Sequence, residues 1–278
     1  MSPAMTDKVG PPSFAVTTSI RLAGVVLALA AFVVAFAPPR RLAQRLGWRF
    51  GERTPVLFQR LLCAGLGVTV RRHGDFCASG SRLIVANHVS WLDIPVMGAL
   101  APMSFLAKKE IGANPAGRLL ASLQGIVYVD RGRRRCIPRV NASMLEAMRA
   151  GSPVVLFAEA TTGDGNRLLR FRSSHFQAIR QAAIADRERP AFIQPVYLHY
   201  SRLGGLPMAR FERPRIAWYG DMTFMPHFAR YAAGGGVTCD VHCGAPIRVG
   251  PDMDRKTAAR LTEAAVRRLA AEARARRG

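Results

Sequence analysis

Short apolar runs alternate with helix-like segments from Val68 to the C-terminus, and this alternation most constrains what the chain can fold into. Apolar runs of about four to eight residues between turn residues are typical of buried strands. Strands that alternate with helices predict an α/β fold, here a mainly parallel central sheet flanked by helices. We expect strands at 68–72, 82–87, 103–107, 126–130, 153–158, 191–198, 215–219 and 237–243, and helices at 90–100, 115–123, 138–150, 173–186, 222–233 and 254–276.

The last of these helices is rich in alanine and arginine. Leu261, Ala265 and Leu269 form only a thin apolar stripe along it. A helix with so narrow an apolar face has little surface to bury, so we expect it to dock weakly or to remain solvated.

The segment 87–93 places a histidine and an aspartate five positions apart at a predicted strand-to-helix junction. Within one helix, side chains at this spacing differ in direction by roughly 140° and do not meet. A turn at His88 would instead bring the imidazole back towards the Asp93 carboxylate. An imidazole held by a carboxylate can take a proton from a hydroxyl, so the pair is a candidate catalytic base.

A structural explanation exists for the same residues. Ser90 could be the N-cap of the following helix, and Asp93, as its third helical residue, the acidic half of a capping box. His88 would then be an ordinary loop histidine. The segment alone leaves both interpretations open.

Four segments resemble, in the same order, the motifs of the glycerolipid acyltransferase family, typified by the 1-acylglycerol-3-phosphate acyltransferases. Asn-His-x-Ser-x-x-Asp at 87–93 resembles the first motif, and the strand ending in Asp-Arg at 125–131 resembles the second. Phe-Ala-Glu-Ala-Thr at 157–161 resembles the third, and Gln-Pro-Val-Tyr at 194–197 the fourth. One short match is weak evidence, but four in order are specific.

The resemblance implies acyl transfer from a thioester to a hydroxyl, without a metal or a bound cofactor. His88 would take the hydroxyl proton, and Asp93 would hold the imidazole tautomer and stabilise its charged form. Sites in open α/β sheets form at the carboxyl ends of strands, so Arg131 and Glu159 should meet His88 on one rim. In the family, the residue at Arg131 binds the acceptor phosphate; a structural pairing with Asp130 or Glu159 is the alternative.

The third motif supplies three further candidate substrate-binding residues, Glu159, Ala160 and Thr161. Glu159 would bridge the motif to Arg131 or to the acceptor, and the alternative is a buried structural ion pair. The family usually has glycine where this chain has Ala160, and a methyl group hinders both a positive φ and a close approach of the backbone to a phosphate. We therefore predict that Ala160→Gly keeps or raises activity.

Two further departures concern the acceptor. Ala158 replaces the usual proline, and no basic residue follows Thr161; the chain continues instead with Thr-Gly-Asp-Gly at 162–165. The run 161–174 also looks like that of a bacterial branch which includes lyso-ornithine lipid acyltransferases, enzymes that acylate an aminolipid hydroxyl. The run 217–222 also resembles this branch, and we assign it no chemistry, since an aromatic strand end usually serves packing.

Composition points to anionic partners. The net charge of +22 suits lipid headgroups, an acidic carrier protein or nucleic acid. The chain lacks a nucleic-acid signature such as an aromatic RNP pair or a Cys/His finger, so we expect no nucleic-acid partner. The five cysteines are scattered, which indicates a reducing compartment. Cys239 and Cys243 alternate with valines as one face of a strand, which favours buried strand cysteines over a zinc site.

The N-terminal part is predicted to associate with a membrane. Residues 22–37 carry no charge, but these sixteen residues span roughly 24 Å as a helix, short of the ~30 Å hydrocarbon core. A thin span, a re-entrant segment and an interfacial anchor all remain open. The basic amphipathic stretch 40–66 could lie at the headgroups or pack as a core helix. Arginines after the apolar segment predict an inner-membrane protein whose catalytic domain faces the cytoplasm.

We divide the chain accordingly into a disordered N-terminus (1–19), a membrane-associating region (20–66) and an acyltransferase catalytic domain (67–278). The leading functional hypothesis is transfer of a fatty acyl group from acyl-CoA or acyl-carrier protein to the free hydroxyl of a lysophospholipid, with 1-acyl-sn-glycerol-3-phosphate as the preferred acceptor and phosphatidic acid as the product. One alternative is O-acylation of lyso-ornithine lipid. Another is a non-enzymatic, membrane-tethered binder of polyanions.

Overall fold

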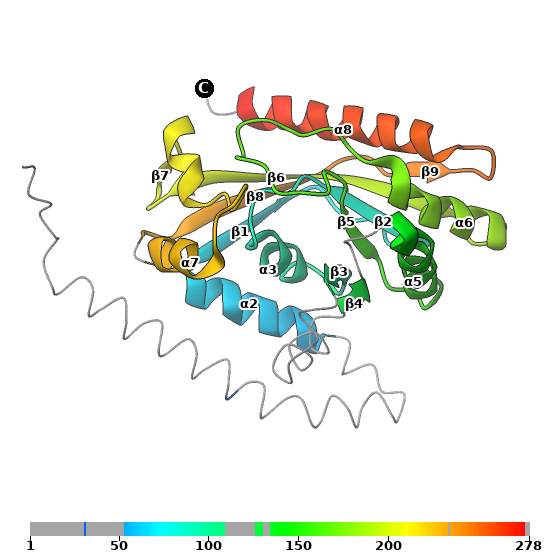
Figure 1. Ribbon diagram of the computed structural model, residues 1–278, viewed down its shortest axis with the longest axis horizontal. Helices are drawn as coiled ribbons and strands as arrows, with labels where there is room; N and C mark the ends of the chain where they lie inside the picture. The colour runs from blue at the N-terminus through cyan, green and yellow to red at the C-terminus, as the bar shows by residue number, and fades with distance from the viewer. Residues whose placement is uncertain (1–30, 32–52, 109–125, 130–133, 233, 276–278) are drawn as a thin grey trace, which may run out of the picture.

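The computed structural model describes residues 31, 53–108, 126–129, 134–232 and 234–275. Within these ranges a nine-stranded sheet lies between two layers of helices (Figure 1). The strands are β1 (Val68–His73), β2 (Ser81–Ala86), β3 (Ser104–Lys108), β4 (Ile126–Val129), β5 (Val154–Phe157), β6 (Ala191–Leu203), β7 (Leu206–Pro207), β8 (Val237–Cys243) and β9 (Ile247–Val249). The α-helices are α2 (Thr54–Leu66), α3 (Asp93–Gly98), α5 (Ile137–Arg149), α6 (Gln177–Ala185), α7 (Phe224–Ala232) and α8 (Arg255–Ala275), and the 3-10 helices are η3 (Arg134–Cys136), η4 (Ser173–Phe176) and η5 (Arg210–Arg215).

The sheet is mixed, with the order β1-β8-β6-β2-β5-β3-β4. From β6 to β4 each neighbouring pair is parallel, as the alternation of strands and helices predicts. β8, however, pairs antiparallel with β6 and parallel with β1. The expectation of a mainly parallel sheet therefore holds for five of the eight described strand pairs, and the antiparallel pairs of β6 with β7, β8 and β9 make the whole sheet mixed.

Each face of the sheet has its own apolar core. α5, α6 and α8 pack on one face through a cluster that includes Met144, Ile179 and Val266. α2, α3 and α7 lie on the other face, where Leu66, Leu92 and Tyr231 belong to a second cluster. Figure 1 shows α8 on one side of the sheet and α2, α3 and α7 on the opposite side. Consecutive strand residues point to opposite faces, so the central strands contribute to both cores.

Local sequence explains why several elements begin and end where they do. β2 reads Ser-Arg-Leu-Ile-Val-Ala and is buried along nearly its whole length, as expected for a central strand covered on both faces. α2 and α5 each have a proline in their first turn, where the missing N–H costs nothing. α2 ends at Gly67, whose φ of 72° is the left-handed conformation that glycine adopts readily.

The observed strands confirm seven of the eight predicted ones; six differ by at most one residue at each end, whereas β6 runs on to Leu203. The predicted strand 215–219 is wrong. Residues up to Arg215 form η5, and the N–H groups of Ile216 and Ala217 bond to the carbonyl of Arg213 instead of to a strand. Ile216 and Ala217 are buried like residues of a core strand, but they make no hydrogen bonds to any described strand of the sheet. The predicted helix 115–123 lies outside the described residues.

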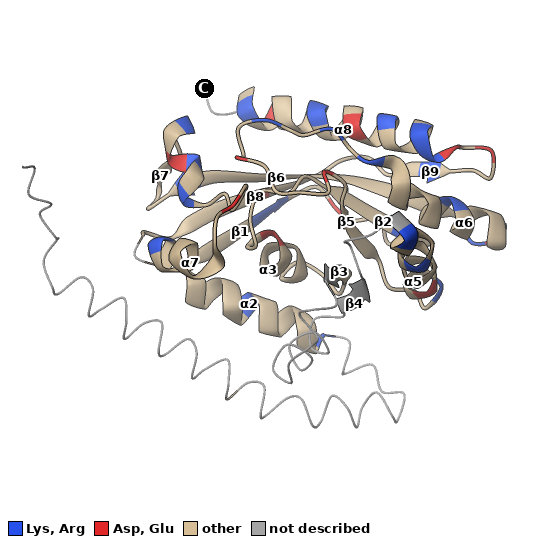
Figure 2. Cartoon of the chain, viewed as in Figure 1, with Lys and Arg blue, Asp and Glu red and all other residues tan. Residues whose placement is uncertain are grey.

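The C-terminal helix does not dock weakly as the sequence analysis expected. α8 packs along β6 and buries a face made largely of small residues: Ala258, Ala259, Thr262, Val266, Ala270 and Ala273. Leu261 of the expected apolar stripe is 40% exposed, so the stripe is not the buried face. The small residues of the actual face allow α8 to approach the sheet closely along most of its length. Lys and Arg recur along α8 (Figure 2), and Lys256, Arg260, Arg267 and Arg268 are exposed.

α2 packs against α3 and buries Phe58 and Cys63. Leu57 and Leu61 on its outer side are each 44% exposed. Within the part of the chain that the structure describes, no helix is both long and apolar enough to cross a membrane. The apolar segment 22–37 lies outside this part, apart from residue 31.

Cys239 is buried on the same face of β8 as Val237 and Val241, as the alternation in the sequence predicts. Burial raises the pKa of the Cys239 thiol well above its ordinary value. Among the described residues, no group of three His, Cys, Asp or Glu side chains is arranged to hold a metal ion.

Candidate active site

The candidate site starts where β2 ends. Asn87 follows the last residue of β2, and its side chain takes the place of a further strand pair: the carboxamide oxygen accepts from the Leu198 N–H at 2.8 Å, and the carboxamide nitrogen donates to the Leu198 carbonyl at 3.2 Å. This two-way contact with β6 anchors the chain at the point where it leaves the sheet. Asn87 is 2% exposed, so the contact is shielded from water.

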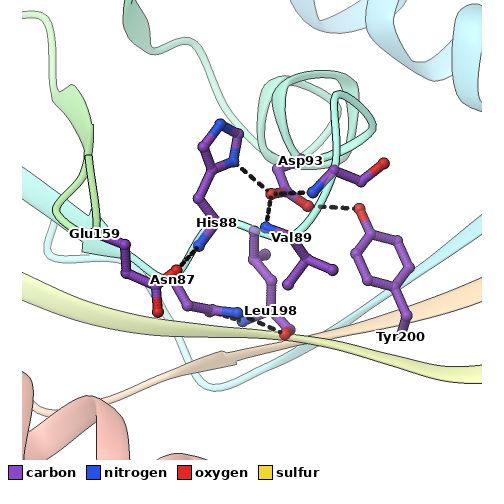
Figure 3. A network of polar contacts seen from close by, with 8 residues as sticks. Asn87, His88, Val89, Asp93, Glu159, Leu198 and Tyr200 are labelled. Carbon is purple, nitrogen blue, oxygen red and sulfur yellow. Dashed lines mark hydrogen bonds and ion pairs between the residues drawn. The ribbon is translucent and has the colours of Figure 1, made fainter. Parts of the chain in front are cut away.

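His88 and Asp93 meet directly across the turn that joins β2 to α3. The His88 Nδ1 lies 2.7 Å from the Asp93 Oδ2 (Figure 3). A carboxylate only accepts hydrogen bonds, so His88 Nδ1 carries the proton and Nε2 is left with a free lone pair. The imidazole also stacks on Phe157 at the end of β5, with ring centroids 4.2 Å apart. The turn at His88 therefore brings the two side chains together, as the sequence predicts.

The Asp93 carboxylate is fully buried and well supplied with donors. Besides the imidazole, the Oδ2 atom accepts from the N–H groups of Val89 at 2.7 Å and Ser90 at 3.0 Å. The hydroxyl of Tyr200 on β6 donates to the Oδ1 atom at 2.7 Å. Burial, followed by the Asp93 charge, raises the pKa of Tyr200 well above its ordinary value, so Tyr200 remains a neutral donor. Both carboxylate oxygens are thus fixed before any substrate binds.

The expected N-cap role of Ser90 is wrong. α3 begins at Asp93 with Leu92 before it, and the Ser90 hydroxyl has no hydrogen-bond partner among the described residues. Asp93 does bind the backbone N–H groups that precede it, which is the acidic half of a capping box. The capping interpretation and the catalytic one are therefore compatible, because the same carboxylate shapes the turn and holds the imidazole.

Glu159 lies just beyond β5, beside the same turn. Its Oε2 accepts from the His88 N–H at 2.9 Å, and its Oε1 accepts from the Leu169 N–H at 2.8 Å. The Glu159 side chain thus links the main chain of His88 to that of Leu169, which lies ten residues after Glu159 in the sequence. Glu159 is 4% exposed. Burial raises the pKa of this carboxyl to about 7, although the two N–H donors act in the opposite direction.

Residues 160–172, which we call the strap, run from this point towards α8. Ala160 has a φ of 63°, the only positive φ of a non-glycine residue among those described. This is the conformation for which the family's usual glycine is suited. The Gly163 N–H donates to the His88 carbonyl at 2.8 Å, and the Arg172 N–H donates to the Ala158 carbonyl at 2.8 Å. Thr161 lies exposed in the strap.

α8 holds the outer part of the strap. Glu263 accepts from the Phe171 N–H at 3.0 Å, and Arg267 pairs with Glu263 at 2.9 Å. Arg274 donates to the Asn166 carbonyl at 3.2 Å. A connected set of contacts therefore leads from α8 through the strap and Glu159 to the main chain of His88.

The structure brings together four of the predicted site positions: His88, Asp93, Glu159 and Ala160 lie around one turn at the carboxyl ends of β2 and β5. Arg131 lies outside the described residues, so its predicted roles stay predictions. Neither the contact of Asn87 with β6 nor the Tyr200 donor is predicted by the sequence. Asn87 stood inside the first motif, but no local signal connected Tyr200 to a carboxylate 107 positions earlier.

Comparison with known proteins agrees with this geometry. A model of the acyltransferase family matches residues 67–199. A lyso-ornithine lipid O-acyltransferase of Brucella abortus is 36% identical over 257 residues, which cover 90% of this chain and 94% of the relative. The chain belongs to the acyltransferase family. The acyl-transfer function expected from the four motifs is thereby confirmed, and the non-enzymatic alternative is not needed.

Other members of the acyltransferase family differ in how much of the chain they match. A lyso-ornithine lipid O-acyltransferase of Rhizobium meliloti is 33% identical and covers 90% of this chain and 85% of the relative. A 1-acyl-sn-glycerol-3-phosphate acyltransferase of Neisseria gonorrhoeae is 42% identical over 96 residues, which are 34% of this chain and 38% of the relative. The crystal structure of PlsC, the 1-acyl-sn-glycerophosphate acyltransferase of Thermotoga maritima, has a TM-score of 0.65 at 15% identity and covers 94% of this chain and 98% of PlsC, which shows a shared fold.

Proposed function

We propose that this acyltransferase esterifies the free hydroxyl of lyso-ornithine lipid, with His88 as the general base. The observation that carries the acceptor is the similarity to lyso-ornithine lipid O-acyltransferases over about nine-tenths of the chain. In this proposal lyso-ornithine lipid takes precedence over 1-acylglycerol-3-phosphate, the acceptor preferred from the sequence.

The proposed mechanism uses the His88–Asp93 pair in one proton cycle. The Nε2 atom of His88 takes the proton of the acceptor hydroxyl while the oxygen attacks the carbonyl carbon of the acyl thioester. Asp93 stabilises the resulting imidazolium through the 2.7 Å contact. A carbon–oxygen ester bond forms and the carbon–sulfur bond breaks. The leaving thiolate then takes the proton from Nε2, which restores the neutral imidazole.

The strap supports an aminolipid acceptor. Asp164 follows Gly163, whose N–H binds the His88 carbonyl, so a carboxylate lies close to the catalytic turn. Burial opposes its ionisation, but N–H donors from Asn166 and Arg167 hold the pKa of Asp164 below its usual value. An anion here repels a phosphate and attracts the ammonium group of an ornithine headgroup. The family's usual basic residue after the third motif would have the opposite preference.

A second candidate acceptor is 1-acylglycerol-3-phosphate. The observation that favours it is the 42% identity with the Neisseria gonorrhoeae relative over 96 residues. This match is local, so it supports the acceptor less strongly than the similarity along nearly the whole chain does. Under this alternative Arg131 would bind the acceptor phosphate.

We further propose that the acyl donor is acyl-CoA or acyl-carrier protein and that the enzyme acts at the cytoplasmic face of the inner membrane. The net charge of +22 supports an anionic donor and an anionic membrane surface. The exposed leucines of α2 follow directly after the apolar and basic N-terminal region, which supports membrane contact on that side of the molecule.

The test is acyl transfer in membranes that contain the full chain. Labelled acyl donor is supplied with lyso-ornithine lipid and with 1-acylglycerol-3-phosphate in parallel. We expect the higher kcat/KM with lyso-ornithine lipid; a preference for the phosphate acceptor would overturn the proposed acceptor.

The general base is tested by His88→Ala, which should lower kcat by roughly a hundredfold to ten-thousandfold. His73→Ala is the matched control. His73 also contacts an aspartate, Asp240, at 2.9 Å, but it is an exposed histidine on β1. Near-normal turnover by folded His88→Ala protein would refute the proposed mechanism.

A further inference from the structure

A basic groove lies between α8 and the end of the strap, outside the catalytic turn. It has a volume of about 1000 Å³ and is bordered by residues 170–174 and by the first turns of α8. Five cationic side chains line it: Arg170, Arg172, Lys256, Arg260 and Arg267. Two carboxylates, Asp254 and Glu263, also line it, so the groove carries a net charge of five minus two, or +3.

Both carboxylates are already engaged. Asp254 accepts from the N–H groups of Lys256 and Thr257 and so caps the start of α8. Glu263 pairs with Arg267 and binds the Phe171 N–H. Among the described residues the other four cationic side chains, those of Arg170, Arg172, Lys256 and Arg260, make no hydrogen bond or ion pair. Unpaired like charges around one depression repel each other, and a polyanionic partner would relieve this repulsion.

The basic surface extends beyond the groove. Lys256, Arg260, Arg267 and Arg268 are all exposed on α8. From Lys256 to Arg268 the helix rises roughly 18 Å, since each residue adds about 1.5 Å. Figure 2 shows Lys and Arg repeated along this helix. A surface of this length matches an acidic helix or protein face better than a single phosphate group.

The position of α8 favours a partner that arrives from water. α8 and α2 cover opposite faces of the sheet. Under the proposed membrane attachment through the N-terminal region and α2, the basic face of α8 looks away from the lipid. A soluble acidic protein therefore fits this surface better than anionic headgroups do.

The groove is also connected to the catalytic turn. Arg170 directly follows Leu169, whose N–H binds the Glu159 carboxylate, and Glu159 binds the His88 N–H. A partner docked against Arg170 therefore sits beside the segment that positions His88. A protein bound in the groove would therefore contact the strap, which is linked to the main chain of His88.

We propose that the groove formed by residues 170–174 and α8 docks the acidic surface of an acyl carrier protein that delivers the acyl thioester. This rests on the proposed function, because it assigns the donor of the same reaction. The cationic side chains steer the carrier protein to the groove, as complementary charges do at other transient interfaces.

The test compares two donors in the full-length enzyme. Lys256→Glu and Arg260→Glu reverse exposed charges on α8 that make no hydrogen bond or ion pair within the described fold, so both variants should fold. With acyl-carrier protein as donor, we expect KM to rise roughly tenfold while kcat stays unchanged. With acyl-CoA as donor, KM should change little. Arg230→Glu on α7, an exposed arginine on the opposite face of the sheet, is the control and should leave both KM values unchanged.

The outcomes separate the two proposals. Unchanged KM for acyl-carrier protein in both groove variants overturns the docking surface, and so does an equal rise for both donors, which indicates a site for phosphate. Direct binding of purified carrier protein to wild type and variants supplies a readout that needs no turnover. If charge reversal abolishes binding of the carrier protein, the docking surface is supported even when no lyso-acceptor is acylated. If no acceptor at all is acylated, the proposed function is refuted, but the docking surface is not.

Discussion

Replacing Tyr200 by phenylalanine removes the hydroxyl that donates to the Asp93 Oδ1 at 2.7 Å. Among the described residues no other group donates to this oxygen. Asp93 is fully buried, so water does not replace the lost donor. The ring of Tyr200 remains, which keeps the packing against the core. The substitution therefore isolates one hydrogen bond to the catalytic carboxylate.

The expected loss follows from the type of bond. A buried hydrogen bond to a charged group contributes about 1.5–3 kcal/mol to stability. For a domain of this size, each kcal/mol shifts the melting temperature by about 2–4 °C. We expect Tyr200→Phe to melt roughly 4–8 °C below wild type, taking about 2 kcal/mol as the loss. If about 1.4 kcal/mol of this loss persists in the transition state, kcat falls roughly tenfold. KM should change little, because Tyr200 touches Asp93 and is not proposed to contact substrate.

The assay is thermal unfolding and acyl transfer on the same purified preparations. Tyr197→Phe is a matched control on the same strand but on the opposite face, where the Tyr197 hydroxyl accepts only a long contact of 3.4 Å from Arg274. The free energy of unfolding of Tyr197→Phe should stay within about 1 kcal/mol of the wild-type value, and its kcat should be unchanged. If Tyr200→Phe behaves like Tyr197→Phe in both measurements, the idea that Tyr200 secures Asp93 is wrong.

Three further substitutions test the strap and its anchors. Ala160→Gly should raise the free energy of unfolding by about 1 kcal/mol, because the φ of 63° strains alanine, and should keep or raise activity; a large loss of activity would contradict this. Burial raises the pKa of Glu159 from its ordinary value to about 7 in the folded protein. Protonated Glu159 therefore stabilises the folded state fully below about pH 4.5, and this stabilisation is lost as the pH rises through 7. The free energy of unfolding should change by roughly 3 kcal/mol over this range. Chemical denaturation between pH 4 and 8 should therefore give a flatter stability profile for Glu159→Gln than for wild type, and parallel profiles would count against this assignment. Glu263→Ala frees the Phe171 N–H and should lower kcat severalfold by loosening the strap, whereas Glu272→Ala, on the exposed side of α8, should not.

Local patterns predicted most of the elements and the heart of the site. The turn between β2 and α3 spans only a few residues, so an apolar run followed by Asn-His and an aspartate five positions later allowed the two side chains to meet, and the resemblance to the family's motifs favoured this pairing. Family resemblance added Glu159 and Ala160, and the structure gives Ala160 the backbone conformation in which the missing glycine would be expected.

Other features depended on contacts between distant residues. Ile216 and Ala217 are buried like residues of a core strand, but the backbone of this run bonds within a turn and to Val89. The face of α8 is made mainly of alanines, whose contribution depends on how closely the helix approaches β6. Neither property is present in the local hydrophobic pattern, so both predictions failed there.

The chain by itself determined the α/β class, the position of the catalytic turn and the pairing of His88 with Asp93, because these depend on period and spacing over a few residues. Only the tertiary structure decided that β8 inserts between β1 and β6 and runs antiparallel to β6, that Tyr200 reaches Asp93, and that α8 anchors the strap beside a basic groove. Each of these features requires segments that are tens to hundreds of residues apart in the sequence to pack against each other. The free energy that favours this packing comes from burial of apolar residues on both faces of the sheet.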